Sequence, residues 1–262
     1  MFSPDPVTSL PELTDAERAV AEALPIGAGP EEAGRVLERV PLWFHTFALD
    51  PAHGLYTPGV ARDHRYRMEF LPASFAGQRV LDVGTFDGFY AFLAEHRGAA
   101  RVVAVDNEQY VAWVKARWGV ELEGGEGFRA IAGLLGSRVE YVRGDALELA
   151  GTSERFDVVL CFGILHRVEN PLGLLRVLGT LVAPGGRLLV DTYGMTGDAG
   201  GDIEVHPPGD VYSHDDYVYW GFGAGGLRAL AAHAGFAGVT IDATPTVDGH
   251  PRILATFERP GG

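Results

Sequence analysis

The chain has 262 residues, 47% of them apolar, which is enough for one α/β domain with an extension. Its formal net charge is −14, and because phosphate contacts supply most of the affinity of nucleic-acid binders, this charge argues against bulk RNA or DNA binding. The single cysteine, Cys161, excludes an intrachain disulfide and a thiolate metal site, and its apolar neighbours indicate a buried thiol.

The N-terminal residues 1–13 are interrupted by proline and serine and lack the basic and apolar regions of a signal peptide. No apolar run approaches the roughly 18–20 residues needed to span a bilayer. We therefore expect a soluble, cytoplasmic protein.

Residues 1–76 are expected to form an N-terminal helical cap with an aromatic lid segment. A capping box opens a helix over 14–24, and apolar spacing predicts a second helix over 31–40. The aromatic run 42–47 either packs on the core or closes over a ligand. A third helix is expected over 62–71, where a proline ends it.

Strands and helices alternate from residue 77 onward, which predicts an α/β domain over residues 77–262. The expected strands are 79–83, 101–105, 139–142, 156–162, 187–191, 238–243 and 252–258. The expected helices are 89–96, 109–118, 128–135, 171–181 and 222–233. Residues 194–216 should form a long loop. Since 244–251 is too short for a crossover helix, the last two strands should pair antiparallel.

The turn after the first of these strands, Gly84-Thr85-Phe86-Asp87-Gly88, is typical of a ligand-binding strand–turn–helix unit. A dinucleotide fingerprint needs a glycine where Phe86 stands, and this side chain would obstruct a pyrophosphate. The pattern acidic-x-Gly-x-x-x-Gly, which begins at Asp82, fits a turn that binds S-adenosylmethionine. For Asp87 the default assignment is a helix N-cap.

Acidic residues at the ends of the next two strands support this ligand. Asp106 ends the strand that begins at 101, where a carboxylate can accept both hydroxyls of a ribose. Asp145 follows the third strand and can accept a hydrogen bond from an adenine amino group. A loop carboxylate or a helix cap is the alternative explanation for Asp145.

Together these features resemble the class I S-adenosylmethionine-dependent methyltransferases over about residues 77–260. The resemblance implies a doubly wound, seven-stranded, mostly parallel sheet with strand order 3-2-1-4-5-7-6 and an antiparallel last strand. It also implies S-adenosylmethionine as cofactor, with Asp82 near the methionine amino group and Gly84 and Gly88 lining the turn.

A closer resemblance is carried by Trp43-Phe44-His45-Thr46, Thr57-Pro58-Gly59, the run 84–92 and Val103-Ala104-Val105-Asp106. These motifs are similar to the tRNA wobble-uridine carboxymethyltransferase-like group, which includes small-molecule methyltransferases of bacterial biosynthetic clusters. In that group the aromatic segment folds against the cofactor, and we expect the Phe86 ring to pack beside the methionine arm. The expected cofactor-binding residues are Phe44, His45, Asp82, Gly84, Thr85, Phe86, Gly88, Asp106, Asn107, Asp145, Ala146 and Phe162.

For the chemistry, His166 is the first choice as general base because its unperturbed pKa of about 6.5 is close to working pH. Packing against the following helix is the alternative for this side chain. Asp191 and Tyr193 are further catalytic candidates. Polar side chains beside aromatic ones suit an acceptor pocket, and the candidates are His206, His214, Tyr219 and Trp220. The spacing of His206, His214, Asp215 and Asp216 matches no metal-site signature, so no metal is expected.

We therefore expect methyl transfer to a small-molecule acceptor, with a hydroxyl of a secondary metabolite, as in antibiotic biosynthesis, as the favoured target. We expect no nucleic-acid or membrane partner, and a homodimer is compatible with the sequence. Two alternatives stay open. One is a tRNA-modifying transferase acting at a wobble uridine, and the other is a non-catalytic cofactor-binding regulator.

Overall fold

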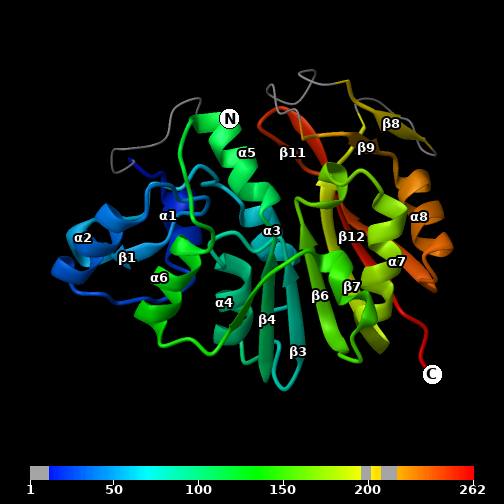
Figure 1. Cartoon of the computed structure of the whole chain (residues 1–262), viewed down its shortest axis with the longest axis horizontal. Helices are drawn as coiled ribbons and strands as arrows, with labels where there is room; N and C mark the ends of the chain where they lie inside the picture. Colours follow the sequence, from blue (N-terminus) through cyan, green and yellow to red (C-terminus); the bar gives the residue numbers. More distant parts are fainter. Residues whose placement is uncertain (1–11, 196–201, 208–216) are drawn as a thin grey trace. The chain divides into compact units, whose positions relative to one another are not determined.

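The computed structural model describes residues 12–195, 202–207 and 217–262 (Figure 1). Its chain forms two compact units. The first contains Gly77–Gly84 and Gly144–Gly262, and the second contains the residues up to Ala76 together with Thr85–Arg143. The expected division into domains at 1–76 and 77–262 stays a prediction. Among the described residues, no helix is long and apolar enough to cross a membrane.

The first unit is built on a sheet in the order β10-β12-β7-β6-β3. Its strands are β3 (Arg79–Val83), β6 (Phe156–Phe162), β7 (Val182–Tyr193), β8 (Ile203–Val205), β9 (Trp220–Phe222), β10 (Gly238–Ala243), β11 (Thr246–Val247) and β12 (His250–Glu258). Its helices are η2 (Ala146–Gly151), η3 (Leu165–Arg167), α7 (Pro171–Leu181) and α8 (Ala224–His233), of which η2 and η3 are 3-10 helices. β3, β6 and β7 pair in parallel, and β12 is antiparallel to both β7 and β10. This is the expected order for these strands.

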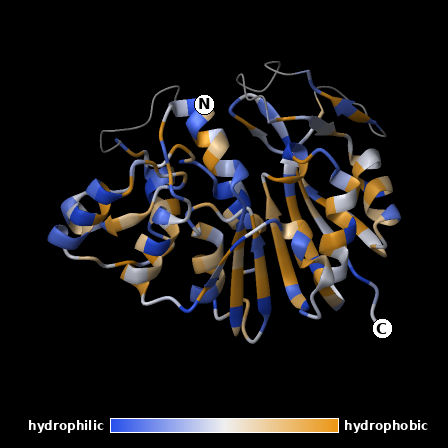
Figure 2. Ribbon diagram, viewed as in Figure 1, coloured by the Kyte–Doolittle hydropathy of each residue, from blue (hydrophilic) through white to orange (hydrophobic). Residues whose placement is uncertain are grey.

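β6 lies between β3 and β7, and its sequence is apolar on both faces. The side chains from Val158 to Cys161 are fully buried, as expected for a parallel strand covered on both sides (Figure 2). α7 packs on β6 and β7 and contacts α8. This helix begins at Pro171, and the side chain of Asn170 caps it by accepting a hydrogen bond from the Gly173 N–H at 2.8 Å.

The second unit contains the parallel pair β4 and β5 and a short antiparallel pair, β1 and β2. Its strands are β1 (Ala48–Asp50), β2 (Leu55–Tyr56), β4 (Arg101–Asp106) and β5 (Glu140–Arg143). Its helices are α1 (Asp15–Ala21), α2 (Pro30–Arg39), η1 (Pro51–His53), α3 (Arg65–Phe70), α4 (Phe89–His96), α5 (Gln109–Trp118) and α6 (Glu126–Leu135). The predicted capping box is present, since Thr14 and Glu17 exchange both of its hydrogen bonds.

The predicted class, an α/β fold with a central and mostly parallel sheet, is confirmed. Several short strands were not predicted, because pairing with a distant segment decides them. β8, inside the expected loop 194–216, pairs with β9, so α8 begins at Ala224 rather than at Phe222. β7 starts directly after α7 and includes Pro184-Gly185-Gly186. The two-residue β11 pairs with β12, so that β11 is an additional short strand beside those expected.

Candidate functional site

The part of the glycine turn in the second unit, residues 85–88, is held by backbone hydrogen bonds. The Thr85 N–H donates to the Val105 carbonyl at 3.3 Å, and the Gly88 N–H donates to the Thr85 carbonyl at 2.9 Å. Gly88 has φ +87°, and an added Cβ would lie 2.5 Å from a ring carbon of Phe92. Both the backbone conformation and the packing of the helix behind the turn therefore require glycine at this position.

Asp106 supports the same turn from the end of β4. This nearly buried carboxylate accepts the Phe86 N–H at 2.6 Å and the Asn107 N–H at 3.0 Å. A carboxylate has about four lone-pair sites, so these two bonds are compatible with hydroxyl donors from a ribose. The Asn107 side chain accepts the Gln109 N–H at the start of α5.

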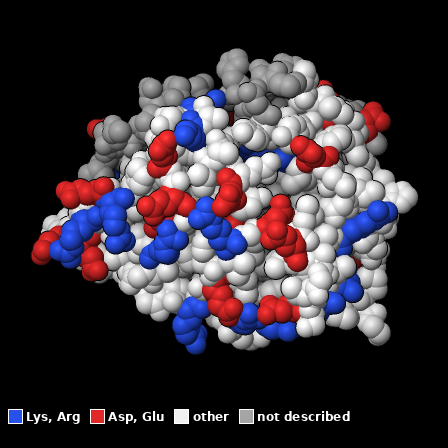
Figure 3. Space-filling model, in the orientation of Figure 1, with Lys and Arg blue, Asp and Glu red and all other residues white. Residues whose placement is uncertain are grey.

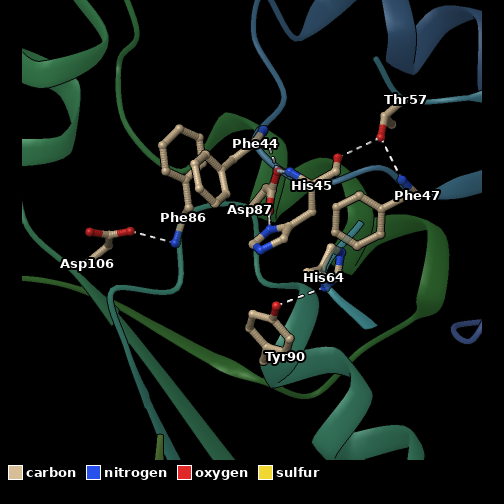
Figure 4. A network of polar contacts seen from close by, with 9 residues as sticks. All are labelled: Phe44, His45, Phe47, Thr57, His64, Phe86, Asp87, Tyr90 and Asp106. Carbon is tan, nitrogen blue, oxygen red and sulfur yellow. Dashed lines mark hydrogen bonds and ion pairs between the residues drawn. The ribbon is translucent and has the colours of Figure 1, made fainter. Parts of the chain in front are cut away.

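Asp87 does not cap a helix, and this corrects the default assignment. The N-cap of α4 is Gly88, which makes no side-chain cap. Asp87 is instead buried, and one of its oxygens accepts the backbone N–H groups of Phe44 and His45, each at 2.8 Å. Its other oxygen bonds Nδ1 of His45 (Figure 4). The glycine turn therefore anchors the aromatic segment through one buried carboxylate.

The Thr57-Pro58-Gly59 motif holds the aromatic segment from its other side. The Thr57 hydroxyl donates to the His45 carbonyl at 2.9 Å and accepts the Phe47 N–H at 2.7 Å (Figure 4). A Cβ at Gly59 would lie 2.3 Å from the His45 carbonyl carbon, so only glycine permits this approach. The backbone of His45 is thus fixed on two sides.

The ring of Phe86 belongs to an aromatic stack. It lies 4.9 Å from the Phe44 ring at an interplanar angle of 30°, and 4.8 Å from the Tyr110 ring. Phe86 is half-buried and has φ +53°, a conformation that is strained for a residue with a side chain. Its contact with the methionine arm stays a prediction.

Two histidine rings lie side by side next to this stack. His45 and His64 are both buried, with ring centroids 5.2 Å apart, and His64 Nδ1 lies 2.9 Å from the Tyr90 hydroxyl (Figure 4). Burial above all, and then His45 and Arg67, holds the pKa of His64 well below its ordinary value of 6.5. Nε2 of each ring is buried and bonds none of the described residues.

In the first unit, the expected cofactor residues lie at the ends of β3 and β6 and at the start of η2. Asp82 is buried, and a Cβ added to Gly84 would lie 2.2 Å from Cδ1 of Ile164. Asp145 is the N-cap of η2 and accepts the Leu147 N–H at 2.8 Å, which is the geometry of the alternative named for it. Ala146 and Phe162 are buried. Their roles toward the cofactor stay predictions.

The structure brings together the expected catalytic and acceptor residues that it describes. His166 is buried in η3, with Nδ1 3.2 Å from the Thr192 hydroxyl and its ring against that of Tyr193. The His166 carbonyl accepts the Tyr219 N–H at 2.9 Å, and the His206 N–H donates to the Tyr219 carbonyl at 2.8 Å. Trp220 Nε1 donates to the Val168 carbonyl. His214, Asp215 and Asp216 lie outside the described residues, within which no three potential metal-ligating side chains form a group.

Asp191 forms a buried ion pair with Arg252. Nε of Arg252 lies 3.0 Å from one carboxylate oxygen, and Nη2 bonds the other. The guanidinium also lies 4.2 Å from the centroid of the Tyr193 ring. Sequence reasoning missed Arg252, although an arginine within an apolar strand expected beside that of Asp191 was an available signal. It also missed His64 and the partners of Asp87, which stand up to 43 positions away without a linking pattern.

Comparisons with known proteins identify the family of this chain. It belongs to the methyltransferase family, since the family model described as "Methyltransferase domain" matches residues 53–241. The predicted class, a class I S-adenosylmethionine-dependent methyltransferase, is confirmed, and S-adenosylmethionine is its cofactor.

Among curated proteins, the chain is similar to tRNA U34 carboxymethyltransferases. It is 28% identical to that of Klebsiella pneumoniae over 170 residues, which are 64% of this chain and 46% of the relative. For Vibrio cholerae the identity is 27% over 242 residues, 88% of this chain and 68% of the relative. The chain thus spans about half the length of the first of these relatives.

The solved structures that share the fold include two that were determined with S-adenosylhomocysteine. One is the Burkholderia thailandensis 1,6-didemethyltoxoflavin-N1-methyltransferase with 1,6-didemethyltoxoflavin and S-adenosylhomocysteine, at TM-score 0.50 and 24% identity, covering 71% of this chain and 72% of that one. The other is the N-terminal domain of EvdMO1 in the presence of S-adenosylhomocysteine and D-fucose, at TM-score 0.61 and 18% identity, covering 87% and 96%.

Proposed function

We propose that this protein transfers the methyl group of S-adenosylmethionine to a small-molecule acceptor, with a hydroxyl of a secondary metabolite as the favoured target. The cofactor supplies an activated methyl group when it is bound. The chain's residues fit it in three respects: a glycine turn after the parallel strand β3, a carboxylate at the end of β4, and the buried Nε2 of His45 without a partner among the described residues. The other residues that we propose to bind it are Phe44, His45, Thr85, Phe86 and Asn107 in the second unit and Asp82, Asp145, Ala146 and Phe162 in the first.

The choice of a small acceptor rests on the arginines of α3, which contact an acidic side chain or aromatic rings of this chain. Arg65 pairs with Asp63 through two nitrogens, and Arg67 is buried with its guanidinium near the rings of Tyr66 and Tyr90. Arg101 likewise pairs with Glu140. On the face in Figure 3, the basic and acidic side chains of the described residues are interspersed rather than gathered in the basic stripe that phosphate binding uses. The net charge of −14 also disfavours phosphate binding.

For the chemical step, we assign His166 as the base that takes the acceptor's proton. Its Nδ1 contact with Thr192 orients the ring, and Tyr193 packs against it. Because Arg252 holds both oxygens of Asp191, we assign Asp191 and Tyr193 to shaping the end of β7. His206, Tyr219 and Trp220 would line the acceptor side, where the Tyr219 N–H bonds the His166 carbonyl and the His206 N–H bonds the Tyr219 carbonyl.

Cofactor binding is tested by isothermal titration calorimetry with S-adenosylmethionine. We expect Asp106→Ala to weaken binding about tenfold or more, because it removes an acceptor for the ribose and a support of the turn. Asp157→Ala is the matched control, since this carboxylate accepts the Arg79 N–H at the opposite ends of the strands and should leave affinity unchanged. Absence of binding by the wild type, or equal binding by Asp106→Ala, would contradict the proposal.

The second candidate is a tRNA-modifying transferase, which the similarity to tRNA U34 carboxymethyltransferases favours. Filter binding with bulk tRNA at low and moderate salt separates the two. The small-molecule proposal predicts weak binding, whereas tight binding that falls steeply with salt would favour the tRNA enzyme. A non-catalytic regulator would bind the cofactor and transfer no labelled methyl group to any fraction of a metabolite extract.

A further inference from the structure

Nε2 of His45 has no partner among the described residues, and the role inferred for it rests on the proposed cofactor site. His45 is buried, and each of its other polar groups has a partner: the N–H and Nδ1 bond Asp87, and the carbonyl accepts the Thr57 hydroxyl. Only Nε2 bonds none of the described residues. A buried polar atom without a partner is costly to maintain, and the ring of His45 also lies against Phe44, which stacks on Phe86 in the expected cofactor turn.

The hydrogen-bond pattern limits which kind of group can bond Nε2. The carboxylate of Asp87 accepts two backbone N–H groups, and an ionised carboxylate is only an acceptor. Nδ1 of His45 must therefore carry the proton that it shares with Asp87. In a neutral ring Nε2 accepts from a hydrogen-bond donor, whereas in an imidazolium Nε2–H donates to an acceptor.

Charge then distinguishes between donors. The buried carboxylate of Asp87 needs a positive charge nearby. A cationic donor at Nε2 of a neutral ring supplies that charge, whereas a hydroxyl does not. In S-adenosylmethionine the cationic donor is the α-ammonium group of the methionine arm. That arm is also the part of the cofactor that we expect beside Phe86, which stacks on the neighbouring Phe44.

We propose that Nε2 of His45 accepts a hydrogen bond from the α-ammonium group of the cofactor, and that Asp87 is the positioning residue that presents it. Asp87 sets the tautomer through Nδ1 and fixes the backbone of His45 through its N–H. The aromatic segment thereby becomes part of the cofactor site rather than a cover that packs only on the core.

Two matched substitutions test this proposal. His45→Asn keeps a donor at about the position of Nδ1, so the bond to Asp87 survives while Nε2 is deleted. His64→Asn does the same at the neighbouring ring, where Nδ1 faces the Tyr90 hydroxyl and Nε2 is also buried. Both lose the same ring volume, so a loss of packing is common to both. We expect S-adenosylhomocysteine to bind His45→Asn about tenfold or more weakly and His64→Asn as it binds the wild type.

Three further measurements locate the effect. 5′-Methylthioadenosine lacks the amino-acid part of the cofactor, so it should bind His45→Asn and the wild type equally. His45→Gln, whose amide reaches about the position of Nε2, should recover part of the affinity for S-adenosylhomocysteine. The unliganded melting temperatures of His45→Asn and His64→Asn should be similar.

Equal weakening by the two asparagine variants, or a loss that persists with 5′-methylthioadenosine, would overturn the assignment to the ammonium group. Wild-type affinity in His45→Asn would overturn the role of His45 while leaving the proposed function intact. If the wild type itself binds neither S-adenosylmethionine nor S-adenosylhomocysteine, the proposed function fails first.

Discussion

Asp191 in the first compact unit and Asp87 in the second are buried carboxylates that are neutralised in different ways. In the first unit, Asp191 faces the guanidinium of Arg252, and two nitrogens hold its two oxygens. In the second, Asp87 faces two backbone N–H groups and an imidazole. The first pair is complete within the protein, whereas the second leaves a ring nitrogen of His45 without a partner among the described residues.

The difference shows how a buried acid can serve structure or a ligand. A buried ion pair whose charges cancel contributes to the shape of the sheet and gains little from a third group. A carboxylate that binds one nitrogen of an imidazole orients the ring, so that the other nitrogen can bond a ligand. We therefore regard Asp191 as a support of β7 and Asp87 as a residue that acts through His45.

The largest expected effect comes from breaking the pair in the first unit. Arg252→Met leaves the charge of Asp191 buried without its partner, which should lower the free energy of unfolding by about 3–5 kcal/mol. Urea unfolding measures this change. The double variant Asp191→Asn/Arg252→Met should recover part of the loss, because no unpaired charge remains. A single-variant loss below about 1 kcal/mol would show that the pair is not the support described.

A smaller effect is expected at the carboxylate of the second unit. Asp87→Asn keeps the shape and one acceptor oxygen but places an amide nitrogen against the His45 ring, so we expect a loss of about 2 kcal/mol in the free energy of unfolding. Asp63→Asn removes an exposed partner of Arg65 and should change it by less than about 1 kcal/mol. Equal effects in the two variants would remove the distinction between a buried anchor and a surface pair.

The smallest effect is a pH dependence from His64. Its pKa is lowered in the folded state, so below about pH 6.5 the unfolded chain binds a proton that the folded chain does not. Stability should therefore fall as the pH falls through this range toward the lowered pKa of His64, by up to about 1.4 kcal/mol per pH unit. Urea unfolding at about pH 7.5 and about pH 5.5 should show a larger loss in the wild type than in His64→Asn. An identical loss in both would contradict the assignment.

Local sequence signals predicted the helices and long strands, because capping residues and apolar runs such as Val158–Cys161 act within a few residues. They also predicted a turn from Gly84 to Gly88 between a strand and a helix, and Asp106 at the end of the next strand. They could not predict that Asp87 binds Phe44 and His45, since a carboxylate beside a helix start has an equally good local role as a cap. β8 and β9 were missed for the same reason, because each is defined by its partner.

The buried thiol of Cys161 has a practical consequence. It lies near the C-terminal end of β6, and burial, with Asp191 and Asp82 nearby, raises its pKa to about 12. Thiolate is the reactive form of cysteine, so alkylating reagents can reach this sulfur only when the central strand opens. Because the chain has one cysteine, the rate at which it is alkylated reports how often the sheet of the first unit opens. No engineered probe is needed for this measurement.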